Sequence, residues 1–163
     1  MCGCRKLILL AKKNKGWQVA KYLLEFERGG STGGNAARKV ALQRVRKLAE
    51  ATALDAGTVA EDPAFKRQLE EAEVQLEAIQ YTEFRLMASL SKGQNPGPES
   101  SVMKALSAKM QQQISELAVI ATGHYAGVHQ PEARTVGSNA AMIGPDAGAM
   151  AFTNYFNFRA SSI

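Results

Sequence analysis

The chain has 163 residues, a formal net charge of +5 and 45% hydrophobic residues, which suits one folded domain with one core. Ala, Leu, Glu, Gln, Lys and Arg dominate its middle and favour helix, and no alternating run of Val, Ile and Thr predicts a convincing strand. Its sequence has no zincin motif, phosphate-binding loop, serine-nucleophile motif or Cys/His cluster, which excludes the enzyme classes that those motifs define.

The positive charge is concentrated near the start, where residues 1–50 hold twelve Lys or Arg against three Glu. Such a segment can meet nucleic acid, a membrane surface or an anionic cofactor, or it can be a solvated helix face. Nucleic-acid motifs and interleaved aromatic residues are missing from it, so we expect no nucleic-acid partner.

The first dozen residues predict neither export nor a membrane span. Cys2 and Cys4 are too close for the usual zinc or redox spacing, and we expect reduced thiols in a cytoplasmic protein. The apolar run from Leu7 to Ala11 is five residues long, whereas a signal peptide needs about seven to fifteen and a membrane helix about twenty.

Helical signals then follow in chain order. A first helix is expected over about 14–28, capped by Asn14 and ended by Gly29 and Gly30. A second is expected over about 37–54, from its apolar stripe.

The third helix, over 63–91, has the strongest signals. Asp62 can cap it, Pro63 suits its first position, and apolar residues recur at spacings of three and four. Residues 91–100 form a loop, and a fourth helix follows over about 101–122, with Gly123 as its stop.

The rest of the chain predicts a long, poorly ordered loop over 130–148 and a short aromatic helix from about Ala149. The whole pattern indicates an all-α protein, an antiparallel four-helix bundle. His124 and His129 are isolated and indicate core or surface histidines rather than metal ligands, so no metal site is expected.

Two stretches carry a family resemblance. "NKGWQVAKYLLEFERGG" resembles the start of the carboxy-terminal helical domain of acyl-CoA dehydrogenases, and "YFNFRASSI" resembles the stretch before the final segment of that family. The resemblance covers 14–163, with 1–13 unmatched, and implies a fragment truncated before its last helix and lacking the two preceding domains.

The family implies an FAD-dependent oxidoreductase of fatty acid β-oxidation, acting on the CH–CH group of an acyl-CoA thioester (EC 1.3 type). A carboxylate takes the α proton while a hydride leaves the β carbon for the flavin. In branched-chain and long-chain types the base is a Glu preceding an Arg in the first helix. By that resemblance Glu27 is the catalytic base and Arg28 binds or orients the substrate, whereas without the family the pair is a solvated helix end. A base in the missing tail is the other possibility.

The resemblance also carries cofactor positions. The family has Arg-x-x-Phe at the start of the third helix, which makes Phe65 a candidate FAD contact, although Asp62 replaces the Arg and core packing is the competing role. It has Gln before a Gly-Gly turn at the end of the fourth helix, where this chain keeps Gly123 but has Ile120 for the Gln. These departures weaken a diphosphate or adenine contact.

Two functions from different classes remain open. One is an acyl-CoA dehydrogenase fragment that is incomplete alone and has electron-transfer flavoprotein as its family partner. The other is a non-catalytic helical module that assembles with itself or with a full-length homologue. In either case we expect a dimer or tetramer, because the aromatic end from Phe152 to Phe158 should expose an apolar patch.

Overall fold

The computed structural model describes residues 15–29, 34–94 and 97–160. Five α-helices dominate these ranges: α1 (Gly16–Gly29), α2 (Gly34–Ala51), α3 (Pro63–Ser91), α4 (Glu99–Thr122) and α5 (Ala151–Arg159). Between α2 and α3 lie a two-stranded antiparallel hairpin, β1 (Ala53–Leu54) with β2 (Gly57–Thr58), and the 3-10 turn η1 (Val59–Glu61). Further 3-10 turns follow α4: η2 (Gly123–Gly127), η3 (Pro131–Arg134) and η4 (Asp146–Gly148). The predicted all-α class is confirmed.

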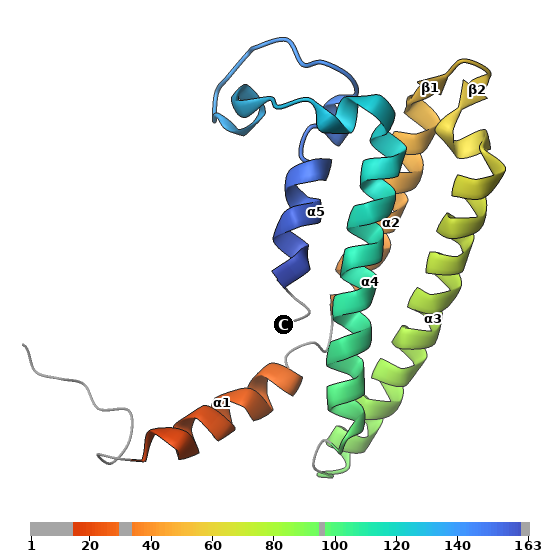
Figure 1. Cartoon of the computed structure of the whole chain (residues 1–163). Helices are drawn as coiled ribbons and strands as arrows, with labels where there is room; N and C mark the ends of the chain where they lie inside the picture. Colours follow the sequence, from red (N-terminus) through yellow and green to blue (C-terminus); the bar gives the residue numbers. More distant parts are fainter. Residues whose placement is uncertain (1–14, 30–33, 95–96, 161–163) are drawn as a thin grey trace, which may run out of the picture.

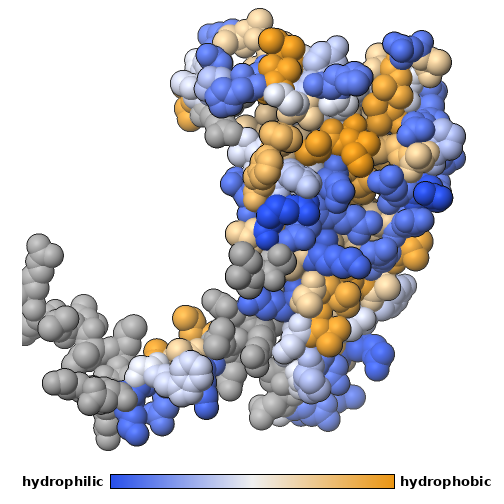
Figure 2. Space-filling view, viewed as in Figure 1, coloured by the Kyte–Doolittle hydropathy of each residue, from blue (hydrophilic) through white to orange (hydrophobic). Residues whose placement is uncertain are grey.

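The core of the bundle is formed by α2, α3 and α4, which lie side by side, and α5 packs against α4 (Figure 1). The first helix takes a different place from the one expected for a bundle member. It contacts α4 but extends away from the other helices (Figure 1), and Trp17 and Leu23 on it are exposed. Figure 2 shows that hydrophobic atoms also reach the surface at several points of a largely hydrophilic face.

The buried stripe of α3 organises the core. Its members follow one another at alternating spacings of four and three, so they share one side of the helix. They are Phe65, Leu69, Ala72, Leu76, Ile79, Glu83 and Leu86. Except for Glu83, they belong to one cluster with buried apolar residues of α2 and α4, including Val45 and Ile114. Each fully buried Leu or Phe contributes about 1.5–3 kcal/mol relative to an exposed one.

The predicted boundaries of α3 are confirmed, because local signals fix them. The Asp62 carboxylate accepts hydrogen bonds from the backbone N–H groups of Ala64 and Phe65, and Pro63 is the first helical residue. At the end of α4, Gly123 has a φ of 61°, a value that L residues with side chains rarely adopt.

The second helix was predicted to reach about residue 54, and this boundary is wrong. It ends at Ala51, after which the Thr52 hydroxyl donates to the Leu48 carbonyl and the Thr52 carbonyl accepts from the Val59 N–H. Between Thr52 and Val59 the chain forms the β1–β2 hairpin, which reverses direction at Gly57, where φ is 95°. The turn brings Val59 into the core. The free energy gained by burying Val59 outweighs what α2 would gain by continuing to residue 54.

Residues 130–148 contain only short 3-10 turns, as expected for a long loop. The Gln130 side chain closes it: its amide donates to the Ile143 carbonyl and its oxygen accepts from the Ile143 N–H, at 3.0 and 2.8 Å. The order of this loop stays a prediction.

Candidate functional site

The predicted catalytic pair falls on the last turn of α1. Both positions belong to the helix Gly16–Gly29, but the side chains of Glu27 and Arg28 lie outside the described part of the chain. Their assigned roles stay predictions. The helix that follows, α2, begins only five positions after the end of α1, so its first turn is the nearest described neighbour along the chain.

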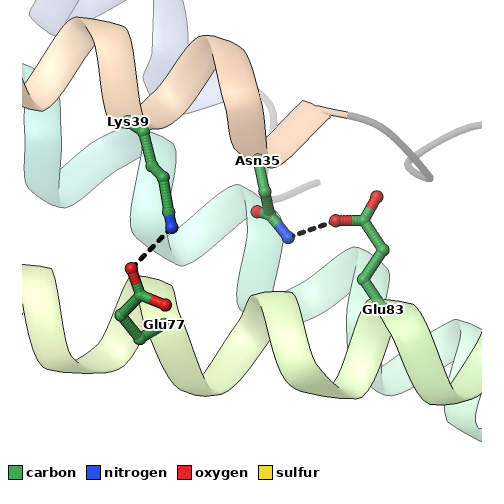
Figure 3. Close-up of polar contacts among 4 residues, drawn as sticks. All are labelled: Asn35, Lys39, Glu77 and Glu83. Carbon is green, nitrogen blue, oxygen red and sulfur yellow. Dashed lines mark hydrogen bonds and ion pairs between the residues drawn. The ribbon is translucent and has the colours of Figure 1, made fainter.

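That first turn holds a buried polar pair. The side-chain amide of Asn35 donates a 2.5 Å hydrogen bond to Oε2 of Glu83 on α3, as Figure 3 shows. Asn35 is 2% exposed and Glu83 is 4% exposed. A buried carboxylate is costly unless it is hydrogen-bonded or paired, so this contact fixes the start of α2 against α3. One turn further along, Lys39 and Glu77 form a more exposed ion pair (Figure 3).

Arg38 extends the polar pair into a cluster. Its Nη1 donates to Oδ1 of Asn35 at 3.1 Å, and its guanidinium folds over the first residue of α2, where a Cβ on Gly34 would lie 2.8 Å from Nη1. Burial lowers the pKa of Arg38, and the nearby charge of Glu83 opposes this shift. Among the described residues, Arg38 Nε is buried without a hydrogen-bond partner.

The Asn35–Arg38–Glu83 cluster was not predicted. One signal was available: Glu83 occupies a place in the apolar stripe of α3, so the helical period alone puts a carboxylate in the core. Nothing local in the sequence indicates that Asn35, 48 positions earlier, is its partner.

The two predicted cofactor positions lie at the opposite end of the bundle. Phe65 follows the hairpin at the start of α3 and is 1% exposed in the core. Gly123 ends α4, and among the described residues a Cβ there would meet just the Thr52 methyl, at 3.7 Å, so its φ, rather than a close neighbour, requires glycine. The helix α2 runs between this end and the end reached by α1 (Figure 1), over about 27 Å at 1.5 Å per residue.

A cleft of about 950 Å³ opens between α2, α4, α5 and residues 144–147. Its lining includes the core residues Val45, Leu48 and Ile114, together with the cations Arg44 and Lys47 of α2 and the carboxylate Asp146. Such a lining can hold an apolar group that carries an anionic end.

One known family matches most of this chain. The model of the acyl-CoA dehydrogenase carboxy-terminal domain matches residues 14–139. The chain belongs to the acyl-CoA dehydrogenase family. The match includes α1 to α4 and ends before α5, so assignment of residues 140–163 to the same domain stays a prediction. No curated protein and no solved structure matches the chain.

The acyl-CoA dehydrogenase positions that resemble FAD contacts do not fit the cofactor in this chain. Where the family has an Arg, the Asp62 carboxylate is occupied in capping α3 and would repel a diphosphate. Phe65 is covered by the core, and the apolar Ile120 replaces the Gln. The assignment of Phe65 and Gly123 to the cofactor stays a prediction, which these surroundings do not favour.

In the part of the chain that the structure describes, no helix is long and apolar enough to cross a membrane. Within the same ranges, no group of three or more His, Cys, Asp or Glu side chains could hold a metal ion.

Proposed function

We propose that this chain is the carboxy-terminal helical part, residues 14–163, of an FAD-dependent acyl-CoA dehydrogenase, and that Glu27 is its catalytic base. The observation that carries the proposal is the family match from residue 14, which includes the Glu27-Arg28 pair on the last turn of α1. The substrate class is an acyl-CoA thioester. The family context adds fatty acid β-oxidation and an electron-transfer flavoprotein partner, and the expected reduced state of Cys2 and Cys4 adds a cytoplasmic location.

The chemistry assigned to Glu27 is proton removal. The thioester carbonyl acidifies the neighbouring α carbon, so its C–H bond can break with the electron pair moving into the enolate and the proton moving to the carboxylate of Glu27. A carboxylate does this best in an apolar, water-poor pocket, where desolvation raises the pKa of the acid. The sequence around it, with Tyr22, Leu24 and Phe26, is suited to such a pocket. Arg28 then orients or polarises groups beside the thioester.

In this reaction the chain supplies the proton transfer and not the hydride transfer. In the family, FAD lies across domains and across a subunit boundary. One chain can therefore supply the catalytic base to one active site and FAD contacts to the active site of a neighbouring subunit. The placement of the two predicted sites at opposite ends of α2 is compatible with that arrangement. Asp62, Phe65 and Ile120 do not fit FAD, so the part of the reaction that this chain supplies is proton removal by Glu27.

Exchange of the α protons of an acyl-CoA with deuterated solvent tests the proposal, because that exchange needs the base and not the flavin. We expect the full chain to exchange the α protons of short, medium or branched acyl-CoA faster than buffer does, as measured by mass spectrometry. Glu27→Gln should slow the exchange at least about a hundredfold, the usual contribution of a positioned base.

Glu25→Gln is the matched control, because residue 25 lies about 200° around the helix from residue 27. It should exchange at the wild-type rate. Equal rates for Glu27→Gln and wild type would contradict Glu27 as the base. A wild-type chain that exchanges no faster than buffer would instead favour the non-catalytic helical module.

A further inference from the structure

The cleft of about 950 Å³ between α2, α4 and α5 is separate from both predicted sites. None of its lining residues belongs to α1, and neither Phe65 nor Gly123 is among them. Apolar side chains of the core form much of its lining, including Val45, Leu48 and Ile114. Its volume is within the range of about 300–1,000 Å³ that is usual for small-molecule sites.

One end of the cleft is formed by the segment that contains Asp146, and close packing holds this segment in place. A Cβ on Gly144 would lie 2.5 Å from Cγ of Tyr125, and a Cβ on Gly148 would lie 2.6 Å from the Thr122 methyl. The two glycines therefore bring the backbone against the end of α4 and the turn η2. The Asp146 carboxylate lines the cleft at this end.

Two cations of α2, Arg44 and Lys47, line the same cleft. They are three positions apart, so they share one face of the helix, and like charges at this spacing repel each other. Among the described residues, neither side chain forms a hydrogen bond or an ion pair, whereas Arg46 of the same helix pairs with Glu73 at 2.6 Å. The two cations are therefore available to an anionic group in the cleft.

The opposite charges lie at different heights in the cleft. Thr52, directly after α2, lies beside Gly123 at the end of α4, since a Cβ on Gly123 would be 3.7 Å from the Thr52 methyl. The segment with Asp146 packs on this same end. Arg44 and Lys47 come eight and five positions before Thr52, so they lie about 12 and 8 Å from it along the helix axis. A ligand that meets both charges therefore carries its cationic and anionic groups roughly 10 Å apart.

Two side-chain amides complete the polar lining. Gln111 of α4 and Asn154 of α5 both line the cleft, and among the described residues neither side chain makes a hydrogen bond. Each amide can donate and accept, so it matches the donor and the acceptor of a peptide group. An extended peptide of three residues spans about 10 Å, at about 3.3–3.6 Å per residue. Such a peptide matches the spacing of the charges, the two amides and the apolar lining together.

We propose that the cleft binds a short apolar peptide of about three residues with both ends free. The ammonium group at its N-terminus pairs with Asp146, and the carboxylate at its C-terminus pairs with Arg44 and Lys47. Capture of both termini selects the length and the direction of the peptide, because a longer one cannot place both ends at once. The proposal does not depend on acyl-CoA chemistry or on Glu27.

Calorimetric titration of the full chain with the tripeptide Leu-Ala-Leu tests this site. We expect saturable binding, and the N-acetylated and C-amidated forms, which each lack one terminal charge, should bind at least about tenfold more weakly. Asp146→Asn should weaken binding of the free tripeptide but not of the acetylated form, which has no ammonium group to lose. Likewise, Arg44→Gln with Lys47→Gln should weaken binding of the free tripeptide but not of the amidated form. The pentapeptide Leu-Ala-Ala-Ala-Leu should bind more weakly than the tripeptide.

The control is Lys66→Gln with Lys92→Gln, which removes the same charge from exposed positions of α3 that do not line the cleft. It should bind the tripeptide like wild type, and circular dichroism of each variant checks that helix content is unchanged. A wild-type chain that binds no tripeptide at millimolar concentration would overturn the proposal. So would blocked peptides or a pentapeptide that bind as tightly as the free tripeptide. Displacement of the tripeptide by octanoyl-CoA would also overturn it, because the cleft would then be a thioester site.

Discussion

The side-chain amide of Asn35 donates a 2.5 Å hydrogen bond to the carboxylate of Glu83, and it joins two buried side chains that are 48 positions apart. The bond ties the first turn of α2 to the last third of α3.

Replacing Glu83 by Leu should lower the free energy of unfolding by about 2–3 kcal/mol, because the Asn35 amide is then left buried without its acceptor. Urea unfolding monitored by circular dichroism measures the change. Glu77→Leu is the comparison, since Glu77 is half exposed in its ion pair with Lys39 and should cost less than about 1 kcal/mol. Equal losses for the two variants would contradict a structural role for the buried pair.

Two glycines at turns should respond differently to Ala. Gly123 has a φ of 61°, and a Cβ there would make an ordinary van der Waals contact with the Thr52 methyl at 3.7 Å, so Gly123→Ala should cost about 1–2 kcal/mol in backbone strain alone. Gly144 has a φ of 83°, and a Cβ there would lie 2.5 Å from Cγ of Tyr125. Gly144→Ala should therefore give the larger drop in melting temperature, and the opposite order would show that the ring of Tyr125 moves freely.

The end of α5 should depend on one glutamine. The Gln112 side-chain amide donates to the backbone carbonyls of Phe158 and Arg159, at 3.2 and 3.4 Å. Gln112→Ala should therefore speed hydrogen exchange of the α5 amides several-fold while leaving α3 unchanged. Gln113→Ala, about 100° around α4, is the control and should leave α5 protected.

Replacing the capping residue of α3, Asp62, by the Arg that is typical of the family should destabilise the protein. Asp62→Arg removes two side-chain hydrogen bonds to Ala64 and Phe65 and puts a cation at a helix N-terminus. It should lower the free energy of unfolding by about 1–2 kcal/mol, whereas Asp62→Asn should stay within about 0.5 kcal/mol of wild type. Thermal unfolding compares the two, and a stable Asp62→Arg would show that the cap is dispensable.

The sequence predicted those parts of the fold that local chemistry determines. The bounds of α3 follow from Asp62, Pro63 and a clean helical period, and the end of α4 follows from Gly123. The end of α2 was missed because its last turn competes with burial of Val59, which depends on helices far along the chain. The position of α1 was missed for a similar reason, since an apolar helical pattern predicts burial without naming the surface that supplies it.

The candidate site was predicted less completely. Family resemblance predicts Glu27 and Arg28 as site residues, which stays a prediction, and helical period alone could have placed Glu83 in the core. The Asn35–Glu83 bond depends on how α2 and α3 pack, and a single sequence does not encode that packing in any local pattern.

The position of a bound substrate relative to Glu27 tests the central claim most directly. A crystal structure of the full chain with a non-reactive acyl-CoA analogue would measure the distance between the Glu27 carboxylate and the α carbon. The account predicts a carboxylate oxygen about 3–3.5 Å from that carbon, the separation of a near-attack arrangement. An analogue bound with its α carbon away from the last turn of α1, or with another carboxylate beside it, would contradict the assignment.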